Sequence, residues 1–243
     1  MNITIIIILL ALLSGATTLI GIAIAFLIKG SEKRIAVGLG FASGIMLAIS
    51  LFELLPNAIN AISIANALIA LVFGFLLILS LHFIIPHIHI IGEKEKLGRI
   101  TGVAFLVTFG MILHDFPEGF AMANSYIFAP ALGLLVALSI AIHNIPEEFA
   151  IAVPLVLTRK KGLLIKLAIL SALAEPLGAM LGLFAVSLAP TLNPLFMAFA
   201  AGAMIFISID ELFPLAKEYK KVSYFILGVA LSLFVYFCLT FIF

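Results

Sequence analysis

Two short stretches, HDFPE at 114–118 and HNIPE at 143–147, nearly repeat each other and lie inside strongly apolar segments. In each stretch a histidine precedes a glutamate by four residues, and side chains at that spacing project from one face of an α-helix. An imidazole nitrogen and a carboxylate oxygen then point toward a common place, as metal ligands do. The proline between them removes a backbone hydrogen bond, which is tolerated in a bilayer only where the chain faces protein or a wet cavity. The two stretches therefore predict a binding site, and we expect the rest of the chain to build the cavity around it.

The composition is that of an integral membrane protein. Of the 243 residues, 65% are hydrophobic and only 10% are charged, which is far too apolar for a soluble domain. We therefore expect one polytopic domain over residues 1–243, with the lipid bilayer as its surroundings. The single cysteine, Cys238, excludes a disulfide within the chain, and the net charge of +1 argues against a nucleic-acid partner. The N-terminal apolar stretch lacks a basic leader region, so we expect it to be retained as the first span.

The charge pattern predicts the topology. Eight apolar runs are long enough to cross a bilayer, at about residues 3–28, 35–56, 63–85, 98–124, 131–157, 163–188, 194–216 and 222–242. All 13 Lys and Arg residues lie in or close to the first, third, fifth and seventh connections, and none lies in the other three. By the positive-inside rule the basic connections face the cytoplasm. The expected fold is an all-α integral membrane protein with eight transmembrane helices and both termini outside.

Most acidic side chains avoid these basic connections. Eight of the 12 lie within or at the ends of the predicted spans: Glu53, Asp115, Glu118, Glu147, Glu148, Glu175, Asp210 and Glu211. No lysine or arginine accompanies them inside the spans, and uncompensated carboxylates in a bilayer are typical of a cation pathway or a proton relay. We therefore expect a positively charged ligand to reach them.

An internal repeat links the outer thirds of the chain. The stretch FASGIMLAISLFELLP at 41–56 matches FAAGAMIFISIDELFP at 199–214, an offset of 158 residues (199 minus 41). Since the second and seventh predicted spans run in opposite directions, the copies are inverted, with helices 1–3 related to helices 6–8 and helices 4–5 central. Inverted repeats around a midplane site are typical of transporters, which places Glu53 at the outer mouth and its counterpart Glu211 at the inner one. The residues expected along the pathway are Glu53, Glu148, Asp210 and Glu211.

The strongest ligand candidates share one depth in the bilayer. At a helical rise of about 1.5 Å per residue, His114, Glu147 and Glu175 all fall near the middle of their spans. The candidate metal ligands are His114, Asp115, Glu118, His143, Asn144, Glu147 and Glu175. This mixture of imidazole and oxygen suits Zn²⁺, Fe²⁺, Mn²⁺ or Cd²⁺, whereas Ca²⁺ and Mg²⁺ prefer oxygen alone. No resident cofactor is expected, because the metal is the transported ion.

Other polar residues leave two interpretations open. Met46 is either a packing residue of an apolar helix or a soft metal ligand. Three histidines near the cytoplasmic end of the third predicted span either pass metal onward or lie at the membrane interface: His82, His87 and His89.

These motifs resemble those of the ZIP (Zrt/Irt-like) family of divalent metal transporters, in particular its prokaryotic GufA/ZupT-type branch. HDFPEGFAMA at 114–123, HNIPEEFAIAVP at 143–154 and AEPLGA at 174–179 are similar to the family signatures of helices 4, 5 and 6. The similarity extends along the whole chain. It implies that helices 1, 4, 5 and 6 move as a unit against a scaffold of helices 2, 3, 7 and 8, and that the protein forms a homodimer.

The resemblance also implies a binuclear centre bridged by Glu118 and Glu147. One metal position is completed by His114, His143 and Met46, and the other by Asp115, Asn144 and Glu175. Two residues depart from the family pattern, because Asp115 stands where the family usually has asparagine and Glu148 where glycine often follows the glutamate. The chain also lacks a long histidine-rich connection, which weakens a sensing role for that segment.

The sequence thus predicts a transporter in the cell membrane that moves Zn²⁺, and also Fe²⁺, Mn²⁺ or Cd²⁺, toward the cytoplasm by alternating access. The main competing hypothesis is an intramembrane metal-dependent hydrolase, although the chain has no HExxH pattern and an inverted repeat has no evident use in hydrolysis. The same residues are also compatible with a proton-coupled carrier of an organic cation and with a membrane metal sensor.

Overall fold

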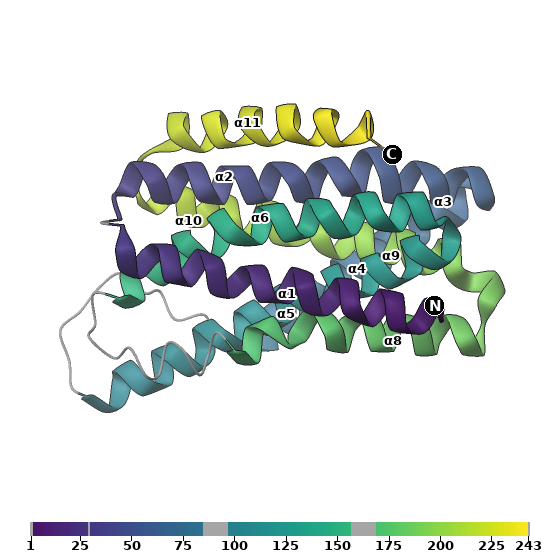
Figure 1. Ribbon diagram of the computed structural model, residues 1–243, viewed down its shortest axis with the longest axis horizontal. Helices are drawn as coiled ribbons and strands as arrows, with labels where there is room; N and C mark the ends of the chain where they lie inside the picture. The colour runs from purple at the N-terminus through teal and green to yellow at the C-terminus, as the bar shows by residue number, and fades with distance from the viewer. Residues whose placement is uncertain (1, 29, 85–96, 157–168, 243) are drawn as a thin grey trace.

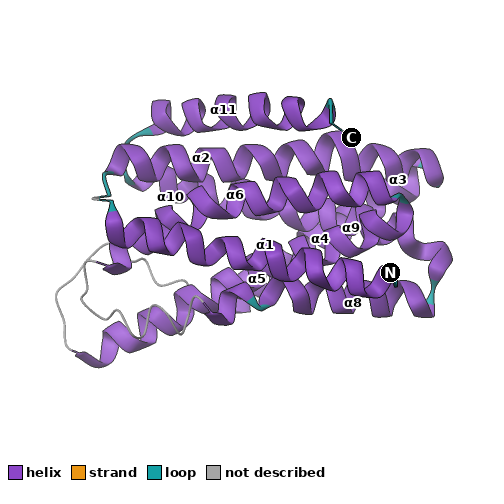
Figure 2. Ribbon diagram, viewed as in Figure 1, coloured by secondary structure: helices purple, strands orange, loops and turns teal. Residues whose placement is uncertain are grey.

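The computed structural model describes residues 2–28, 30–84, 97–156 and 169–242, and within these ranges all regular structure is helical (Figure 2). The α-helices are α1 (Ile3–Leu27), α2 (Glu32–Ala48), α3 (Leu55–Ala61), α4 (Ile64–Ile84), α5 (Leu97–Phe128), α6 (Pro130–Val156), α8 (Ala174–Leu188), α9 (Asn193–Ile207), α10 (Phe213–Glu218) and α11 (Val222–Thr240). Two π-helical turns, η1 (Ile49–Leu54) and η3 (Ser208–Leu212), and a 3-10 turn, η2 (Pro190–Leu192), join some of them. His87 and His89 lie outside the described residues.

Seven helices of the described part are long and apolar enough to cross a membrane. They cover Ile3–Leu27, Glu32–Ala61, Ile64–Phe83, Pro130–Val153, Ile169–Leu188, Pro190–Glu218 and Val222–Thr240. The helix α5, which carries HDFPE, is 32 residues long and packs against α6, α8 and α9, but it is not among the seven. The chain is therefore a multi-pass membrane protein, and its described part is all-α.

Two spans are longer than the sequence predicts. The second continues to Ala61 instead of ending at residue 56, and the seventh continues to Glu218 instead of 216. Pro56 and Pro214 lie near the predicted ends of these spans, and proline lacks the N–H of the helical ladder. A π-helical turn precedes each proline, and the helix continues beyond it.

These two π turns occupy equivalent places in the sequence repeat. The N–H of Leu55 donates to the carbonyl oxygen of Ser50, and the N–H of Phe213 donates to that of Ser208. Both pairs are related by the same offset (208 minus 50 and 213 minus 55 are each 158). The repeated sequences therefore share an uncommon local backbone as well as similar residues.

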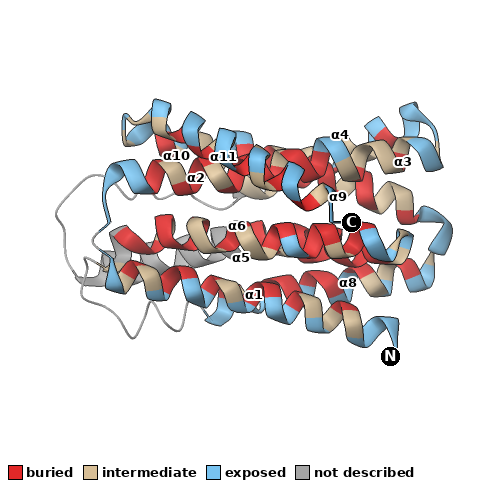
Figure 3. Ribbon diagram, turned by 45° about the horizontal axis from the view of Figure 1, so that its top comes forward, coloured by how far each residue is buried: buried red, intermediate tan, exposed pale blue. Residues whose placement is uncertain are grey.

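The long helices form two layers (Figure 3). In one layer α2 packs against α11, and α4 packs against α9. In the other layer α1 packs against α6, and α5 packs against α8. The layers meet where α2 contacts α6 and where α5 contacts α9. Both chain ends lie toward one end of the bundle, opposite the end where α1 joins α2 and α10 joins α11 (Figure 1).

The outer helices have many exposed residues, as the pale blue segments along α1 and α8 show in Figure 3, and many of these residues are apolar. Leu13, Phe83, Leu188 and Phe234 are 66%, 78%, 70% and 69% exposed. A soluble protein rarely exposes apolar surface on this scale, whereas the acyl chains of a bilayer cover it without cost. The polar side chains are instead found inside, and they build the site described next.

Two glycines allow the backbones of α5 and α8 to touch. A Cβ atom at Gly119 would collide with the carbonyl oxygen of Glu175, and one at Gly178 would collide with the carbonyl oxygen of Phe116. Small residues at such crossings let membrane helices approach closely. The close approach brings Glu175 of α8 beside the helix that carries HDFPE.

Candidate metal centre

Four predicted ligands converge where α5 and α6 pack together. His114 and Glu118 come from α5, and His143 and Glu147 come from α6. The spacing of four residues within each helix puts both side chains of a pair on the face that meets the other helix. All four are buried, with exposures between 0% and 4%. The structure thus brings these four residues together, and their role as metal ligands stays a prediction.

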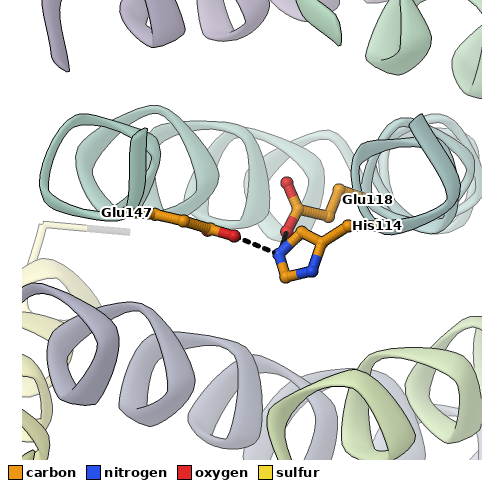
Figure 4. Close-up of side chains that lie close together, drawn as sticks. All are labelled: His114, Glu118 and Glu147. Carbon is orange, nitrogen blue, oxygen red and sulfur yellow. Dashed lines mark ion pairs between the residues drawn. The ribbon is translucent and has the colours of Figure 1, made fainter. Parts of the chain in front are cut away.

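Each histidine faces both glutamates. His114 Nε2 lies 2.5 Å from Glu147 Oε1 and 3.7 Å from Glu118 Oε1. His143 Nε2 lies 3.0 Å from Glu118 Oε1 and 3.6 Å from Glu147 Oε2. In Figure 4 the imidazole of His114 and the carboxylates of Glu118 and Glu147 point toward one another from the two helices. One ligand atom from each of these three residues lies within 4.8 Å of the other two, which is close enough for all three to hold one metal ion.

The orientation of His143 is fixed from its other side. Its Nδ1 lies 3.1 Å from the carbonyl oxygen of Ser139, one turn earlier on α6. Because a carbonyl only accepts hydrogen bonds, Nδ1–H is the donor, and a neutral ring then presents the lone pair of Nε2 to the site. A second hydrogen bond of this kind commonly orients metal-binding histidines.

The centre has an excess of buried negative charge. Among the described residues, the ion pairs of Glu118 and Glu147 come from histidines alone. Glu118, Glu148 and Glu175 each have one buried carboxylate oxygen without a hydrogen-bond partner among the described residues. Buried carboxylates of this kind need a cation or protons to offset the cost of leaving water.

The residues predicted for a second metal position form two smaller groups. Asn144 Nδ2 donates to Glu175 Oε1 over 2.6 Å, and it lies 3.4 Å from the carbonyl oxygen of Ser14 on α1. Asp115 instead accepts a hydrogen bond from the hydroxyl of Ser171. The amide of Asn144 thus links α1, α6 and α8 beside the four central ligands, because it directly follows His143 in the chain.

Met46 and Glu148 are buried close to this region. The Met46 sulfur accepts a hydrogen bond from Ser208 Oγ at 3.7 Å, so Met46 contacts the π turn η3. Glu148 has its Cβ against Gly21 of α1, and its carboxylate interacts electrostatically with Asp115. Asp115 and Glu148 therefore lie in the same part of the interior.

The predicted pathway residues have different partners. Glu53 Oε1 lies 2.5 Å from the hydroxyl of Tyr236. Glu211 Oε2 lies 4.0 Å from His114 Nδ1, and Glu211 Oε1 lies 3.6 Å from His82 Nδ1. The other ring nitrogen of His82 lies 3.4 Å from Asp210 Oδ2. His82, whose role the sequence left open, is thus next to both acids of η3.

Sequence reasoning missed Ser14, Ser171 and Tyr236. The two serines are small polar residues in apolar segments, and this was the only signal of an interior role. Tyr236 is 183 residues from its partner Glu53, and no local pattern relates the two positions.

A multi-pass helical bundle with a buried His/Glu cluster that could hold a metal ion defines the class to which this protein belongs: integral membrane proteins with a candidate cation site in their interior. A family model described as ZIP zinc transporter matches residues 86–236. The chain is 39% identical over 223 residues to the zinc transporter ZupT of Shigella dysenteriae serotype 1 (strain Sd197) and to that of Escherichia coli O7:K1 (strain IAI39 / ExPEC), with 86% of each chain covered. It is 38% identical over 220 residues to the zinc transporter ZupT of Salmonella paratyphi A, again with 86% of each chain covered. The chain belongs to the ZIP zinc transporter family, in its ZupT-type branch, and is a transporter rather than an enzyme.

Proposed function

We propose that this protein carries divalent transition-metal cations, first of all Zn²⁺, across the cell membrane toward the cytoplasm. The observation that carries the proposal is the convergence of His114, Glu118, His143 and Glu147 in the interior, with no Lys or Arg paired to these acids among the described residues. Two imidazoles and two carboxylates are a suitable donor set for Zn²⁺, Fe²⁺, Mn²⁺ and Cd²⁺. An organic cation has no comparable need for imidazole lone pairs, which weighs against an organic-cation carrier.

The centre is binuclear in this proposal. Glu118 and Glu147 bridge two ions, with His114, His143 and Met46 around the first. Asp115, Asn144 and Glu175 hold the second, and the hydrogen bond between Asn144 and Glu175 supports a shared role for these two. Ser171 orients Asp115 through its hydroxyl.

We further propose that α5 is an eighth transmembrane helix and that the fold is an inverted repeat with both termini outside. Three observations support this: the matched π turns at an offset of 158 residues, the antiparallel course of α2 and α9 in Figure 1, and the packing of α2 on α11 and α9 on α4. The exposed basic residues Arg34 and Lys217 lie near the opposite end from the chain termini, which is the cytoplasmic end by the positive-inside rule.

Transport then proceeds by alternating access between the two layers. The cation arrives at Glu53, passes to the central ligands, and leaves toward Glu211, His82 and Asp210, with Glu148 lining the route. The distance of 4.0 Å between Glu211 and His114 supports a direct transfer from the centre to the inner mouth. Because the ligands must release protons to bind metal, protonation weakens binding and assists release.

Membership of a transporter family decides against an intramembrane hydrolase. A non-transporting sensor differs from a carrier in one measurable respect, since it binds metal without net flux. The homodimer implied by the resemblance is part of this proposal and is tested by the mass of the purified protein in detergent.

The test is metal flux into proteoliposomes of defined orientation. Radioactive Zn²⁺ uptake is measured alongside Fe²⁺, Mn²⁺ and Cd²⁺, with liposomes lacking protein as the background. Saturable flux of Zn²⁺ supports the proposal. Binding of Zn²⁺ without flux identifies a sensor, and flux of an organic cation without metal flux identifies an organic-cation carrier.

A further inference from the structure

Tyr236 of α11 is the buried partner of the outer carboxylate. Its side chain is 1% exposed, and its hydroxyl lies 2.5 Å from Glu53 Oε1. A buried tyrosine hydroxyl needs a hydrogen-bond partner, and an ionised carboxylate only accepts, so the tyrosine donates. The ring is itself held, since it stacks on Phe52 with centroids 6.0 Å apart and meets the edge of Phe237 at 5.4 Å. The hydroxyl therefore occupies a fixed position beside the π turn that carries Glu53.

The equivalent carboxylate of the other repeat is held by a different kind of group. Glu211 corresponds to Glu53 by the 158-residue offset (211 minus 53). Its partner is the imidazole of His82 on α4, the helix that packs on α9 as α11 packs on α2. An imidazole can take a proton and offset the charge of Glu211. A phenol hydroxyl instead donates one hydrogen bond and leaves the full negative charge of Glu53 in place.

We propose that Tyr236 is a positioning residue for Glu53 as the acceptor of the incoming metal, an inference that rests on the proposed transport function. The hydroxyl restrains one carboxylate oxygen and leaves the other, Oε2, with its charge available to a divalent cation. Without the hydroxyl, the three rotatable bonds of the glutamate side chain are freer. Ordering a flexible ligand lowers affinity, whereas a ligand already held in position binds more tightly.

The predicted effect is on capture of the metal and not on its passage. In Tyr236→Phe, the ring and its stacking remain and only the hydroxyl is lost. We expect KM for Zn²⁺ uptake to rise about three- to tenfold, which is the size of effect expected for the loss of one typical hydrogen bond, with kcat within about twofold of the wild type. Zn²⁺ affinity of the central site, measured by equilibrium dialysis in detergent, is expected to be unchanged.

The experiment compares Tyr236→Phe, Glu53→Gln and the double variant in oriented proteoliposomes. Tyr224→Phe is the matched control, because Tyr224 lies on the same helix and its ring face contacts Lys33 at 5.2 Å without involving Glu53. If the tyrosine acts through the carboxylate, the double variant has the KM of Glu53→Gln alone.

The inference would be overturned by an unchanged KM in Tyr236→Phe, by a lower KM, which would make the hydroxyl a competitor of the metal, or by additive effects in the double variant. A parallel loss of kcat and of central-site affinity would show a structural role and would overturn it as well. Failure of the proposed function is a separate result, since wild-type protein and Tyr224→Phe would then also give no saturable metal flux.

Discussion

His143 Nε2 lies 3.0 Å from Oε1 of Glu118, so an imidazole of α6 and a carboxylate of α5 face each other across the contact between the two helices. The ring is held on its opposite edge by the carbonyl oxygen of Ser139. Two proposed ligands from different helices are thus already oriented in the structure. Such preorganisation lowers the cost of binding, because little side-chain freedom remains to be lost.

Removal of one central carboxylate charge is expected to abolish transport. Glu118→Gln keeps the size of the side chain but loses its charge, and we expect Zn²⁺ affinity to fall at least about tenfold, since even residues behind metal ligands have effects of this size. Uptake of radioactive Zn²⁺ in proteoliposomes measures the result, with Glu218→Gln at the exposed end of α10 as the control. Wild-type rates in Glu118→Gln would remove this residue from the centre.

Loss of Asn144 is expected to change the number of bound ions. Its amide joins Glu175 to α1, so Asn144→Ala leaves the second metal position incomplete. We expect the purified protein to hold one Zn²⁺ instead of two, as counted by elemental mass spectrometry after dialysis. Two ions in the variant, or one ion in the wild type, would contradict a binuclear centre.

Acidic pH is expected to weaken metal binding. Zinc binds the neutral form of histidine and the ionised form of glutamate, so protons compete with Zn²⁺ for His114, His143, Glu118 and Glu147. The sign follows directly: each proton displaced on binding makes the affinity fall as the pH falls. Titration of Zn²⁺ at about pH 6 and about pH 7.5, on either side of the ordinary histidine pKa, measures the difference. An affinity that is equal at both values would exclude imidazole ligands.

Zinc is expected to stabilise the folded protein against heat. A ligand that binds only the folded state at 100 times its Kd adds about 2.7 kcal/mol to the free energy of unfolding. We therefore expect a higher Tm with Zn²⁺ than with a chelator, and little difference between the two in His114→Ala. Equal stabilisation of wild type and variant would place the bound zinc elsewhere.

The contact between α5 and α8 is expected to tolerate no added side chain. Gly119→Ala puts a Cβ against the carbonyl oxygen of Glu175, and overpacking of this kind typically costs about 1–3 kcal/mol of stability. Met180→Leu is the control, because Met180 of α8 is 53% exposed on the outside of the bundle. Thermal unfolding in detergent distinguishes the two, and equal Tm values would mean that the helices separate easily.

Much of the centre could be predicted from the sequence because its ligands obey a local rule. His114 and Glu118, like His143 and Glu147, are one turn apart, and helical geometry alone brings each pair to one face. Seven of the eight predicted spans have counterparts in the structure for a similar reason, since apolar length is a property of each segment. Two predicted spans ended too early, at residues 56 and 216, because each helix continues through a π turn and past the proline that follows it, and such turns have no simple sequence signal.

The partners of the ligands could not be predicted in the same way. Ser14 approaches Asn144, and Tyr236 approaches Glu53, across 130 and 183 residues. These contacts depend on how helices pack, which no periodicity within one helix specifies. The repeat does relate Glu53 to Glu211, but it does not indicate that one is held by a phenol and the other by an imidazole.

The apolar exterior described for Leu13, Phe83, Leu188 and Phe234 is poorly solvated by water, so the protein needs lipid or detergent around it. A detergent micelle or a lipid disc covers this apolar surface. The melting temperature therefore depends on the detergent or lipid as well as on the protein. Melting temperatures of variants can be compared only in the same detergent or lipid, because a change of acyl-chain length itself perturbs the helix bundle.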